Sequence, residues 1–256
     1  MADEKGGITQ AELMESGMLH AGLSVVLQAP TGWGKTWVSE QEIVREFSAG
    51  LKAIYLAPVR VLAEEICARW SRVMQGAKVG IFTGEYGTED RPFAVPFEEA
   101  DVLVMTPERL DLCTRDWKKH LPWMARVSLV IVDELHTLAD GRRGARLEGA
   151  ISRFMRLCPL ARLIGMSATL GNRSELARWL GGIAVHSTDR PVPIEWRVVR
   201  FKKVSDKLQC AVDVVAKCVA EGGTSLVFCQ SRKRTQEVAA ALMEAGSISR
   251  IEKGHL

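Results

Sequence analysis

The sequence predicts an α/β fold built on a doubly wound parallel sheet. Short runs rich in β-branched residues alternate along the chain with stretches that have the spacing of amphipathic helices, which is the pattern of repeated βα units. Residues 129–132 are apolar without interruption, as expected of a strand that is buried on both faces of a parallel sheet. Residues 1–189 are therefore predicted to form one α/β domain.

The expected elements of this domain follow in chain order. Thr9 and Glu12 have the spacing of a capping box, which predicts a short helix at the start. Strands are expected at residues 24–28, 52–56, 78–82, 101–105, 128–132 and 161–166, and helices from Lys35, through residues 68–70, and at 107–113, 144–157 and 172–180.

Residues 190–195 are predicted to be a linker. Pro191 and Pro193 cannot lie inside a helix or a central strand. A second βα series is expected after them, in residues 196–256. Its strands are predicted at about 194–200 and 224–229, and its helices at 205–220 and 233–244.

The composition indicates a globular protein. The chain has 256 residues, of which 47% are hydrophobic and 25% charged, enough to bury a sizeable core. A formal net charge of +3 is too small to indicate a nucleic-acid partner by itself.

The six cysteines lack metal-ligand spacing and are expected to be reduced and buried. No apolar leader or membrane-length run is present in the sequence, so a cytoplasmic location is expected, with nucleoid association as an option.

Residues 29–36 read Ala-Pro-Thr-Gly-Trp-Gly-Lys-Thr and lie between an apolar run and a helical pattern. Gly32 and Gly34 can adopt the φ values that turn several backbone N–H groups inward, and the following helix N-terminus favours phosphate. Lys35 is expected at the β/γ-phosphates and the Thr36 hydroxyl at Mg²⁺. The strict pattern has glycine where Ala29 stands, so an ordinary turn is the alternative. The residues expected around the nucleotide are Thr31, Gly32, Trp33, Gly34, Lys35 and Thr36.

Asp133 and Glu134 follow the apolar run 129–132 directly. Carboxylates at the carboxyl end of a parallel strand lie where open α/β sheets bind ligands. Asp133 is therefore expected to hold Mg²⁺ through water, and Glu134 to polarise the attacking water. A solvated acidic turn is the alternative, which the nearby phosphate loop makes less attractive.

Further polar groups follow the other predicted strands, where they suit the backbone of a nucleic-acid strand. Each alone is also typical of a helix cap or a turn. The residues expected to contact nucleic acid at this edge are Pro58, Arg60, Thr83, Gly84, Thr106, Pro107 and Arg109.

Taken in order, these motifs resemble those of superfamily-two helicases. Within that superfamily the chain resembles the Ski-like branch of ATP-dependent DNA and RNA helicases, from about Thr9 to about Leu242. The strings that carry the resemblance are residues 133–136 (Asp-Glu-Leu-His), 143–148 (Arg-Gly-Ala-Arg-Leu-Glu), 166–172 (Met-Ser-Ala-Thr-Leu-Gly-Asn), 179–181 (Trp-Leu-Gly), 190–195 (Arg-Pro-Val-Pro-Ile-Glu) and 226–233 (Leu-Val-Phe-Cys-Gln-Ser-Arg-Lys).

The resemblance implies two RecA-like domains, with ATP and Mg²⁺ in the cleft between them and single-stranded DNA or RNA running across both. It gives Gln10 the role of reading adenine, although Gln10 is equally suited to be a polar residue in the first turn of a helix. Ser167 and Thr169 would couple the state of ATP to domain closure. Ser231 would contact nucleic-acid phosphates, as would Arg60, Thr106 and Arg109 of the first domain.

One departure from the family pattern stands out. The family's second domain continues to a helix whose arginines reach the γ-phosphate, and members also carry winged-helix and ratchet-like domains, whereas this chain reaches Leu256 without them. The resemblance therefore implies a monomeric motor whose second domain a further polypeptide completes, and little turnover by residues 1–256 alone.

Two other functions remain open from the sequence. The chain could be an ATP-dependent clamp or adaptor that binds nucleic acid without unwinding it. The acidic pair Asp133-Glu134 argues against a purely structural relic. A P-loop kinase acting on a metabolite is the third choice, but it leaves Ser167, Thr169 and the linker without a role.

Overall fold

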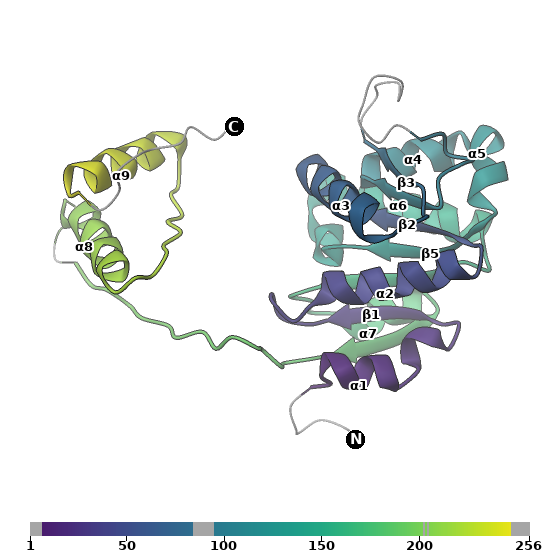
Figure 1. Cartoon of the computed structure of the whole chain (residues 1–256), viewed down its shortest axis with the longest axis horizontal. Helices are drawn as coiled ribbons and strands as arrows, with labels where there is room; N and C mark the ends of the chain where they lie inside the picture. Colours follow the sequence, from purple (N-terminus) through teal and green to yellow (C-terminus); the bar gives the residue numbers. More distant parts are fainter. Residues whose placement is uncertain (1–6, 84–94, 202, 204, 247–256) are drawn as a thin grey trace. The chain divides into compact units, whose positions relative to one another are not determined.

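The computed structural model describes residues 7–83, 95–201, 203 and 205–246. The chain divides into two units, residues 1–193 and residues 194–256 (Figure 1).

A seven-stranded sheet forms the centre of the first unit. Its order is β3-β4-β2-β5-β6-β1-β7, and every neighbouring pair is parallel. The strands are β1 (Ser24–Gln28), β2 (Lys52–Leu56), β3 (Val79–Phe82), β4 (Val102–Met105), β5 (Val127–Val132), β6 (Arg162–Ser167) and β7 (Gly182–His186). The predicted doubly wound parallel sheet is thus confirmed.

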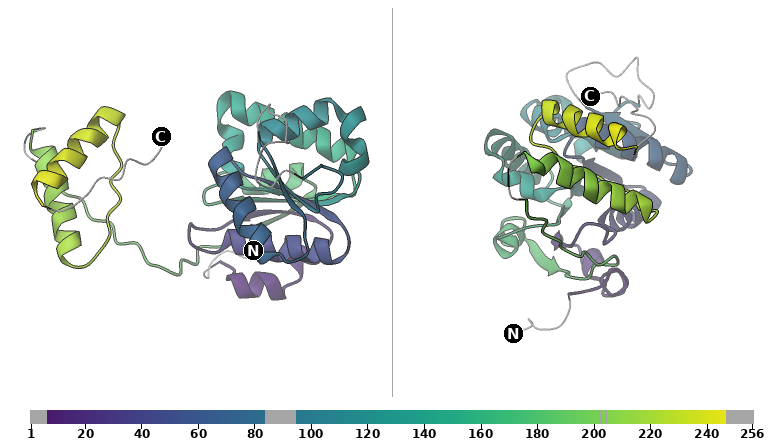
Figure 2. Two further views of the ribbon diagram at one scale, coloured as in Figure 1. Left: turned by 45° about the horizontal axis from the view of Figure 1, so that its top comes forward. Right: turned by 90° about the vertical axis from the view of Figure 1, so that its left-hand side faces the viewer.

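Helices lie on both faces of this sheet (Figures 1 and 2). One apolar cluster packs one face against α1 (Gln10–Glu15), α2 (Lys35–Ser48) and α3 (Arg60–Val73). A second cluster packs the other face against α4 (Pro107–Arg115), α5 (Trp117–Met124), α6 (Gly141–Leu157) and α7 (Arg173–Trp179).

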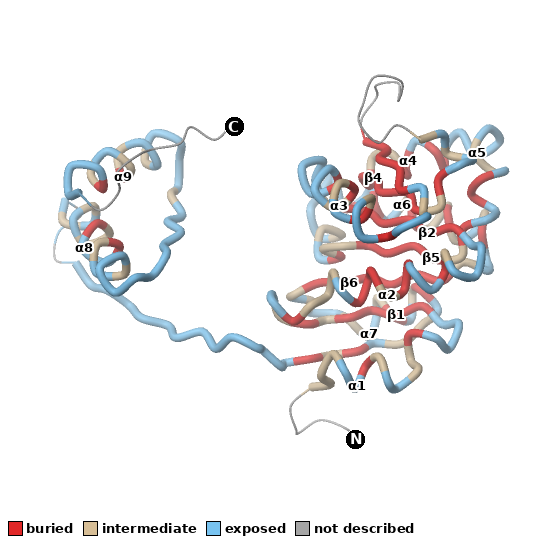
Figure 3. Tube along the Cα trace, in the orientation of Figure 1, coloured by how far each residue is buried: buried red, intermediate tan, exposed pale blue. Residues whose placement is uncertain are grey.

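The alternation of side chains along a strand explains why the central strands are mostly apolar on both faces. On β2, Ala53 and Tyr55 belong to the first cluster, whereas Ile54 and Leu56 belong to the second. All four are at most 1% exposed, and the strands appear as buried segments of the chain trace in Figure 3. Both faces of the sheet are therefore core.

The helix start predicted from Thr9 is confirmed, because Thr9 and Glu12 form both bonds of a capping box. Within the described residues, four elements were not predicted. They are α5, the edge strand β7, and the 3₁₀ turns η1 (Met18–His20) and η3 (Leu135–Ala139). Pro122 lies within the second turn of α5, and such a residue ordinarily argues against a helix.

The second unit contains two packed helices, α8 (Asp206–Ala220) and α9 (Arg232–Glu244), joined through Val212, Val215, Val238 and Leu242. The predicted strands at 194–200 and 224–229 are wrong, since no strand forms in these described stretches. A strand needs a partner for its backbone groups, and none pairs with them here. Trp196 and Phe228 are 88% and 89% exposed as a result.

All six cysteines are free thiols, as predicted. Cys67, Cys113 and Cys158 are buried, and burial raises the pKa of each to about 11. The expectation of burial is wrong for the three cysteines of the second unit, Cys210, Cys218 and Cys229, which are half-buried because that unit has only a small apolar cluster.

No helix in the described part of the chain is long and apolar enough to cross a membrane.

Phe154 tests the second core cluster. It lies on α6 and is fully buried, so Phe154→Ala is expected to lower the free energy of unfolding by about 3–5 kcal/mol. Leu160→Ala is the matched control, because Leu160 is 97% exposed and its loss should change stability by less than about 0.5 kcal/mol. Urea titration of both variants measures the difference; similar midpoints would contradict the packing described.

Candidate active site

The loops that carry the candidate site residues start at the carboxyl ends of three adjacent strands of the first unit, β5, β6 and β1. The phosphate loop follows β1, the acidic pair follows β5 and Ser167 ends β6. Ala29 donates its backbone N–H to the carbonyl of Ser167 over 3.0 Å. The three motifs that are far apart in sequence are therefore neighbours in the fold.

The phosphate loop has the backbone that its glycines predict. Gly32 has φ 84° and Gly34 has φ 100°, a region that residues with a Cβ rarely adopt. Gly34 caps the N-terminus of α2, so the free N–H groups of that helix face the loop. Gln10 donates from Nε2 to the carbonyl of Gly34 over 3.2 Å, and a Cβ on Gly34 would collide with that amide.

Lys35 folds back across the loop. Its Nζ donates to the carbonyls of Ala29 and Pro30, at 2.8 and 3.0 Å. Partial burial lowers the pKa of Lys35, while the carboxylates of Glu134 and Asp133 act in the opposite sense. The Lys35 ammonium thus lies against the loop, where phosphate oxygens can replace the carbonyls of Ala29 and Pro30 as acceptors.

Trp33 fills the base of the same loop. The residue is 3% exposed and belongs to the first core cluster. Its Nε1 is buried and has no hydrogen-bond partner among the described residues. An unpaired buried donor costs about 1–3 kcal/mol, so any loop rearrangement that gives the indole a partner is favoured.

Asp133 is held by two donors. Tyr55 donates its hydroxyl to Oδ2 over 2.8 Å, and the backbone N–H of Glu134 donates to Oδ1 over 3.0 Å. Burial and then the neighbouring Asp133 carboxylate raise the pKa of Tyr55 well above its usual range, so its hydroxyl keeps its proton. Tyr55 had no role in the sequence prediction, because β2 and β5 are brought together only by the sheet.

Glu134 adopts the left-handed conformation, with φ 51° and ψ 53°. Within the described residues it is the one non-glycine residue with a positive φ, a conformation that costs about 1–3 kcal/mol and often marks a functional site. Its Oε2 lies 3.1 Å from Nδ1 of His136. The strained backbone thus ends the strand direction at Glu134, whose carboxylate lies next to His136.

His136 connects the acidic turn to the motif predicted to couple ATP and domain closure. Its Nδ1 lies 2.9 Å from Oγ of Ser167. That hydroxyl also donates to the carbonyl of Thr169 and accepts from its N–H, at 3.1 and 3.3 Å. A continuous polar chain thus joins Glu134 to Thr169. His136 was part of the recognised motif, but its contact with Ser167 was not predicted, because it depends on β5 and β6 being neighbours in the sheet.

The residues present fit a magnesium–nucleotide complex. Thr36, in the first turn of α2, and Asp133 supply the kind of oxygen ligands that Mg²⁺ takes alongside phosphate oxygens and water. The described part of the chain holds no group of three or more acidic, histidine or cysteine side chains that could bind a metal alone. The donor set therefore suits a metal that arrives with phosphates.

The residues predicted to contact nucleic acid follow β2, β4 and β3, on the other half of the same sheet edge. Arg143 donates to the carbonyl of Pro58 over 2.6 Å and lies 3.7 Å from Glu108, so it ties two of these loops together. Arg60 pairs with Glu64 at 2.9 Å and is about half exposed. Thr106 and Pro107 are buried at the start of α4.

The remaining candidates are dispersed. Arg109 lies over the ring of Phe97, 5.2 Å from its centroid, with its Nε buried and unpartnered among the described residues. Thr83 is buried after β3, and Gly84 lies outside the described residues. Ser231 belongs to the second unit, where it caps α9 by accepting from the N–H of Arg234.

This arrangement defines a RecA-like P-loop domain. Residues 8–176 match the family described as DEAD/DEAH box helicase, and the chain belongs to that family. The predicted resemblance to superfamily-two helicases is thereby confirmed, whereas its Ski-like branch stays a prediction.

Curated relatives agree with this family. The chain is 36% identical over 247 residues to the ATP-dependent DNA helicase Hel308 of Pyrobaculum calidifontis, covering 92% of this chain and 34% of that protein. It is 30% identical over 246 residues to the Hel308 of Methanocella arvoryzae, covering 90% and 32%. The chain thus spans about a third of the length of these relatives.

A solved structure supports the fold alone. The DUF1998 helicase MrfA superposes with a TM-score of 0.73 at 19% identity, over 96% of this chain and 39% of that one.

Lys35 and Glu134 are expected to separate ATP binding from hydrolysis. Lys35→Ala should weaken ATP binding about 10- to 100-fold, because charged hydrogen bonds to ground-state phosphates contribute about 1.5–3 kcal/mol. Glu134→Gln should bind ATP as well as the wild type and lower any measured turnover by at least about 10². Calorimetric titration and a phosphate-release assay measure these effects. Lys78→Ala, at the opposite edge of the sheet, is the control; equal affinities for Lys35→Ala and wild type would refute the site.

Trp33 is expected to report nucleotide binding by its fluorescence, since its buried indole lies within the loop that rearranges around phosphate. Trp33→Phe should remove most of the MgATP-induced change in emission. Trp117→Phe removes a tryptophan that is 41% exposed on α5 and should leave the change intact. An unaltered signal in Trp33→Phe would show that the loop keeps its conformation.

Proposed function

We propose that this chain is the ATP-binding part of an ATP-dependent helicase or translocase that binds MgATP and single-stranded nucleic acid. The observation that carries the proposal is the meeting of the phosphate loop, the acidic pair and Ser167 at the ends of β1, β5 and β6. A structural relic would have no need to keep Glu134 in a strained backbone conformation beside Asp133.

The roles of the residues follow from their positions. The loop N–H groups and Lys35 bind the phosphates, and Gln10, whose amide already reaches the loop, is proposed to contact the base. Thr36 and Asp133 hold the hydrated metal, which when bound neutralises charge on the β- and γ-phosphates. Glu134 orients the attacking water, and its contact with His136 leads to Ser167 and Thr169, the proposed coupling motif.

Nucleic acid is proposed to follow the half of the edge formed by β2, β4 and β3. Arg60, Thr106 and the start of α4 supply phosphate contacts there, with Pro58 contacting the strand beside them, and such contacts position a strand without reading its sequence. The relatives are named DNA helicases, so single-stranded DNA is proposed as the substrate. Ser231, which caps α9 in the second unit, is proposed as a further contact to nucleic acid.

An adaptor function is the second candidate. Trp196, Leu226 and Phe228 are at least 80% exposed in the second unit, and exposed apolar side chains of this kind favour contact with another polypeptide. ATP turnover separates the two functions. An adaptor would bind ATP and DNA without turnover, so Glu134→Gln would have no turnover to reduce.

Arg60 is expected to contribute one ionic contact to DNA. Arg60→Gln should weaken binding of a single-stranded oligonucleotide and reduce the slope of log affinity against log salt by about 0.7, the value for one phosphate on a single strand. Fluorescence anisotropy at several salt concentrations measures the slope. Arg156→Gln is the matched control, since Arg156 lies in the last turn of α6, away from the loops. An unchanged slope for Arg60→Gln would show that the nucleic-acid strand does not contact Arg60.

A further inference from the structure

We propose that Tyr55 is a positioning residue for the nucleotide site: its hydroxyl holds the Asp133 carboxylate in the orientation that receives the hydrated Mg²⁺ of the nucleotide. The proposal rests on the proposed function, and it gives a specific task to a residue that lies within β2, one residue before its end, and is not part of the loops themselves.

The parallel register explains why this side chain reaches Asp133. Tyr55 is the direct neighbour of Ile131 on β5, and both residues belong to the first core cluster. Asp133 is two residues beyond Ile131 and therefore lies on the same face, nearer the carboxyl edge. A phenylalanine ring would stop short of it, whereas the Tyr55 hydroxyl makes a bond of 2.8 Å to Oδ2.

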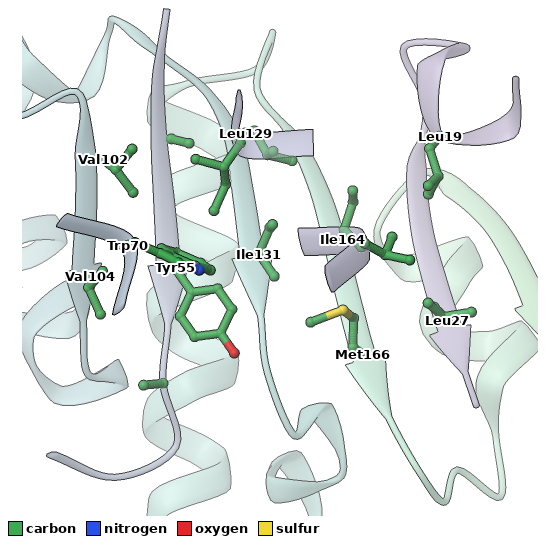
Figure 4. Close-up of a cluster of buried hydrophobic side chains, with 14 of the residues drawn as sticks. Leu19, Leu27, Tyr55, Trp70, Val102, Val104, Leu129, Ile131, Ile164 and Met166 are labelled. Carbon is green, nitrogen blue, oxygen red and sulfur yellow. The ribbon is translucent and has the colours of Figure 1, made fainter. Parts of the chain in front are cut away.

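The tyrosine ring itself is firmly held. It packs edge-on against Trp70, with ring centroids 4.9 Å apart and planes at 78°, and Figure 4 shows its hydroxyl pointing away from that contact. Trp70 donates from Nε1 to Oε1 of Glu40 over 2.7 Å, and Arg69 pairs with the other oxygen at 2.9 Å. Glu40 lies on α2, the helix that begins at the phosphate loop.

Two donors on opposite oxygens fix the plane of the Asp133 carboxylate. The Glu134 N–H occupies one lone-pair position on Oδ1 and Tyr55 occupies one on Oδ2. Each oxygen keeps a further acceptor position, which is what a hydrated metal requires. Without the tyrosine donor only the bond from Glu134 remains, so the carboxylate is free to rotate about its last torsion, which is broad.

The predicted effect is specific for the metal. Partners that orient a metal-binding side chain typically affect metal affinity about 10- to 100-fold when they are removed. Tyr55→Phe preserves the ring and its contact with Trp70. It should therefore leave binding of the nucleotide without metal unchanged within about twofold and raise about tenfold the Mg²⁺ concentration that gives half of the metal-dependent gain in affinity.

The test uses the full chain and a non-hydrolysable ATP analogue. Its dissociation constant is measured by calorimetry in EDTA and over a series of Mg²⁺ concentrations, for wild type and Tyr55→Phe. Thr114→Val is the matched control, because the Thr114 hydroxyl is also buried and hydrogen-bonded, to Arg153 on the opposite face of the sheet. This control should lose stability and keep the wild-type Mg²⁺ dependence.

A double-mutant cycle keeps the proposal testable if Tyr55→Phe also lowers stability. If Tyr55 acts through Asp133, the Mg²⁺ dependence of Asp133→Asn should not change further when Tyr55→Phe is added to it. Additive effects, an unaltered Mg²⁺ requirement in Tyr55→Phe, or an equal loss of affinity with and without metal would each overturn the assignment. Absence of nucleotide binding by the wild type would instead overturn the proposed function.

Discussion

Backbone hydrogen bonds that continue one residue past the parallel strands fix where each loop of the site begins. Beyond β1, the N–H of Ala29 reaches the carbonyl of Ser167 on β6 at 3.0 Å. Beyond β5, the N–H of Asp133 reaches the carbonyl of Leu56 on β2 at 3.1 Å. Beyond β2, the N–H of Ala57 reaches Met105 on β4 at 2.9 Å. The loops thus begin at the same level of the carboxyl edge of the sheet. The distances between their side chains therefore follow from the register of the strands.

The hydrogen-bonded edge of the sheet allows the site to hold groups in conformations they would not adopt alone. Glu134 stays in the left-handed region and Trp33 keeps an unpaired indole N–H in the core. Both costs are of order 1–3 kcal/mol, which is small against the burial of two complete apolar clusters around the sheet. Strain at the edge is tolerated because the core beneath it is fully packed.

Elements whose pattern is set by local residues were predictable from the sequence. Strands such as β1 and β2 occupy the predicted residues because a mostly apolar run of this length is stable between two layers of helix. The start of α1 was readable from Thr9 and Glu12. The stretches 194–200 and 224–229 had an equally good strand pattern. Whether such a stretch forms a strand depends on a neighbouring strand that pairs with its backbone, and the local residue pattern does not show whether that neighbour is present.

The connections within the site were beyond the reach of the sequence for the same reason. The hydrogen bond from Tyr55 to Asp133 spans 78 positions, and it depends on β2 and β5 being adjacent and in one register. Arg109 illustrates the reverse case. Its place in a recognised motif predicted an exposed phosphate contact, but the fold brings Phe97 beneath it, and this contact competes with the expected one.

β2 is the strand of the proposed DNA half that adjoins β5 of the nucleotide half. Its Tyr55 binds Asp133, which follows β5, and three residues later Pro58 begins the loop proposed to contact DNA. The carbonyl of Pro58 accepts from Arg143 of α6, and α6 follows the turn that starts at Glu134. The acidic turn is therefore joined to the start of the DNA loop twice, once through the strand and once through the helix.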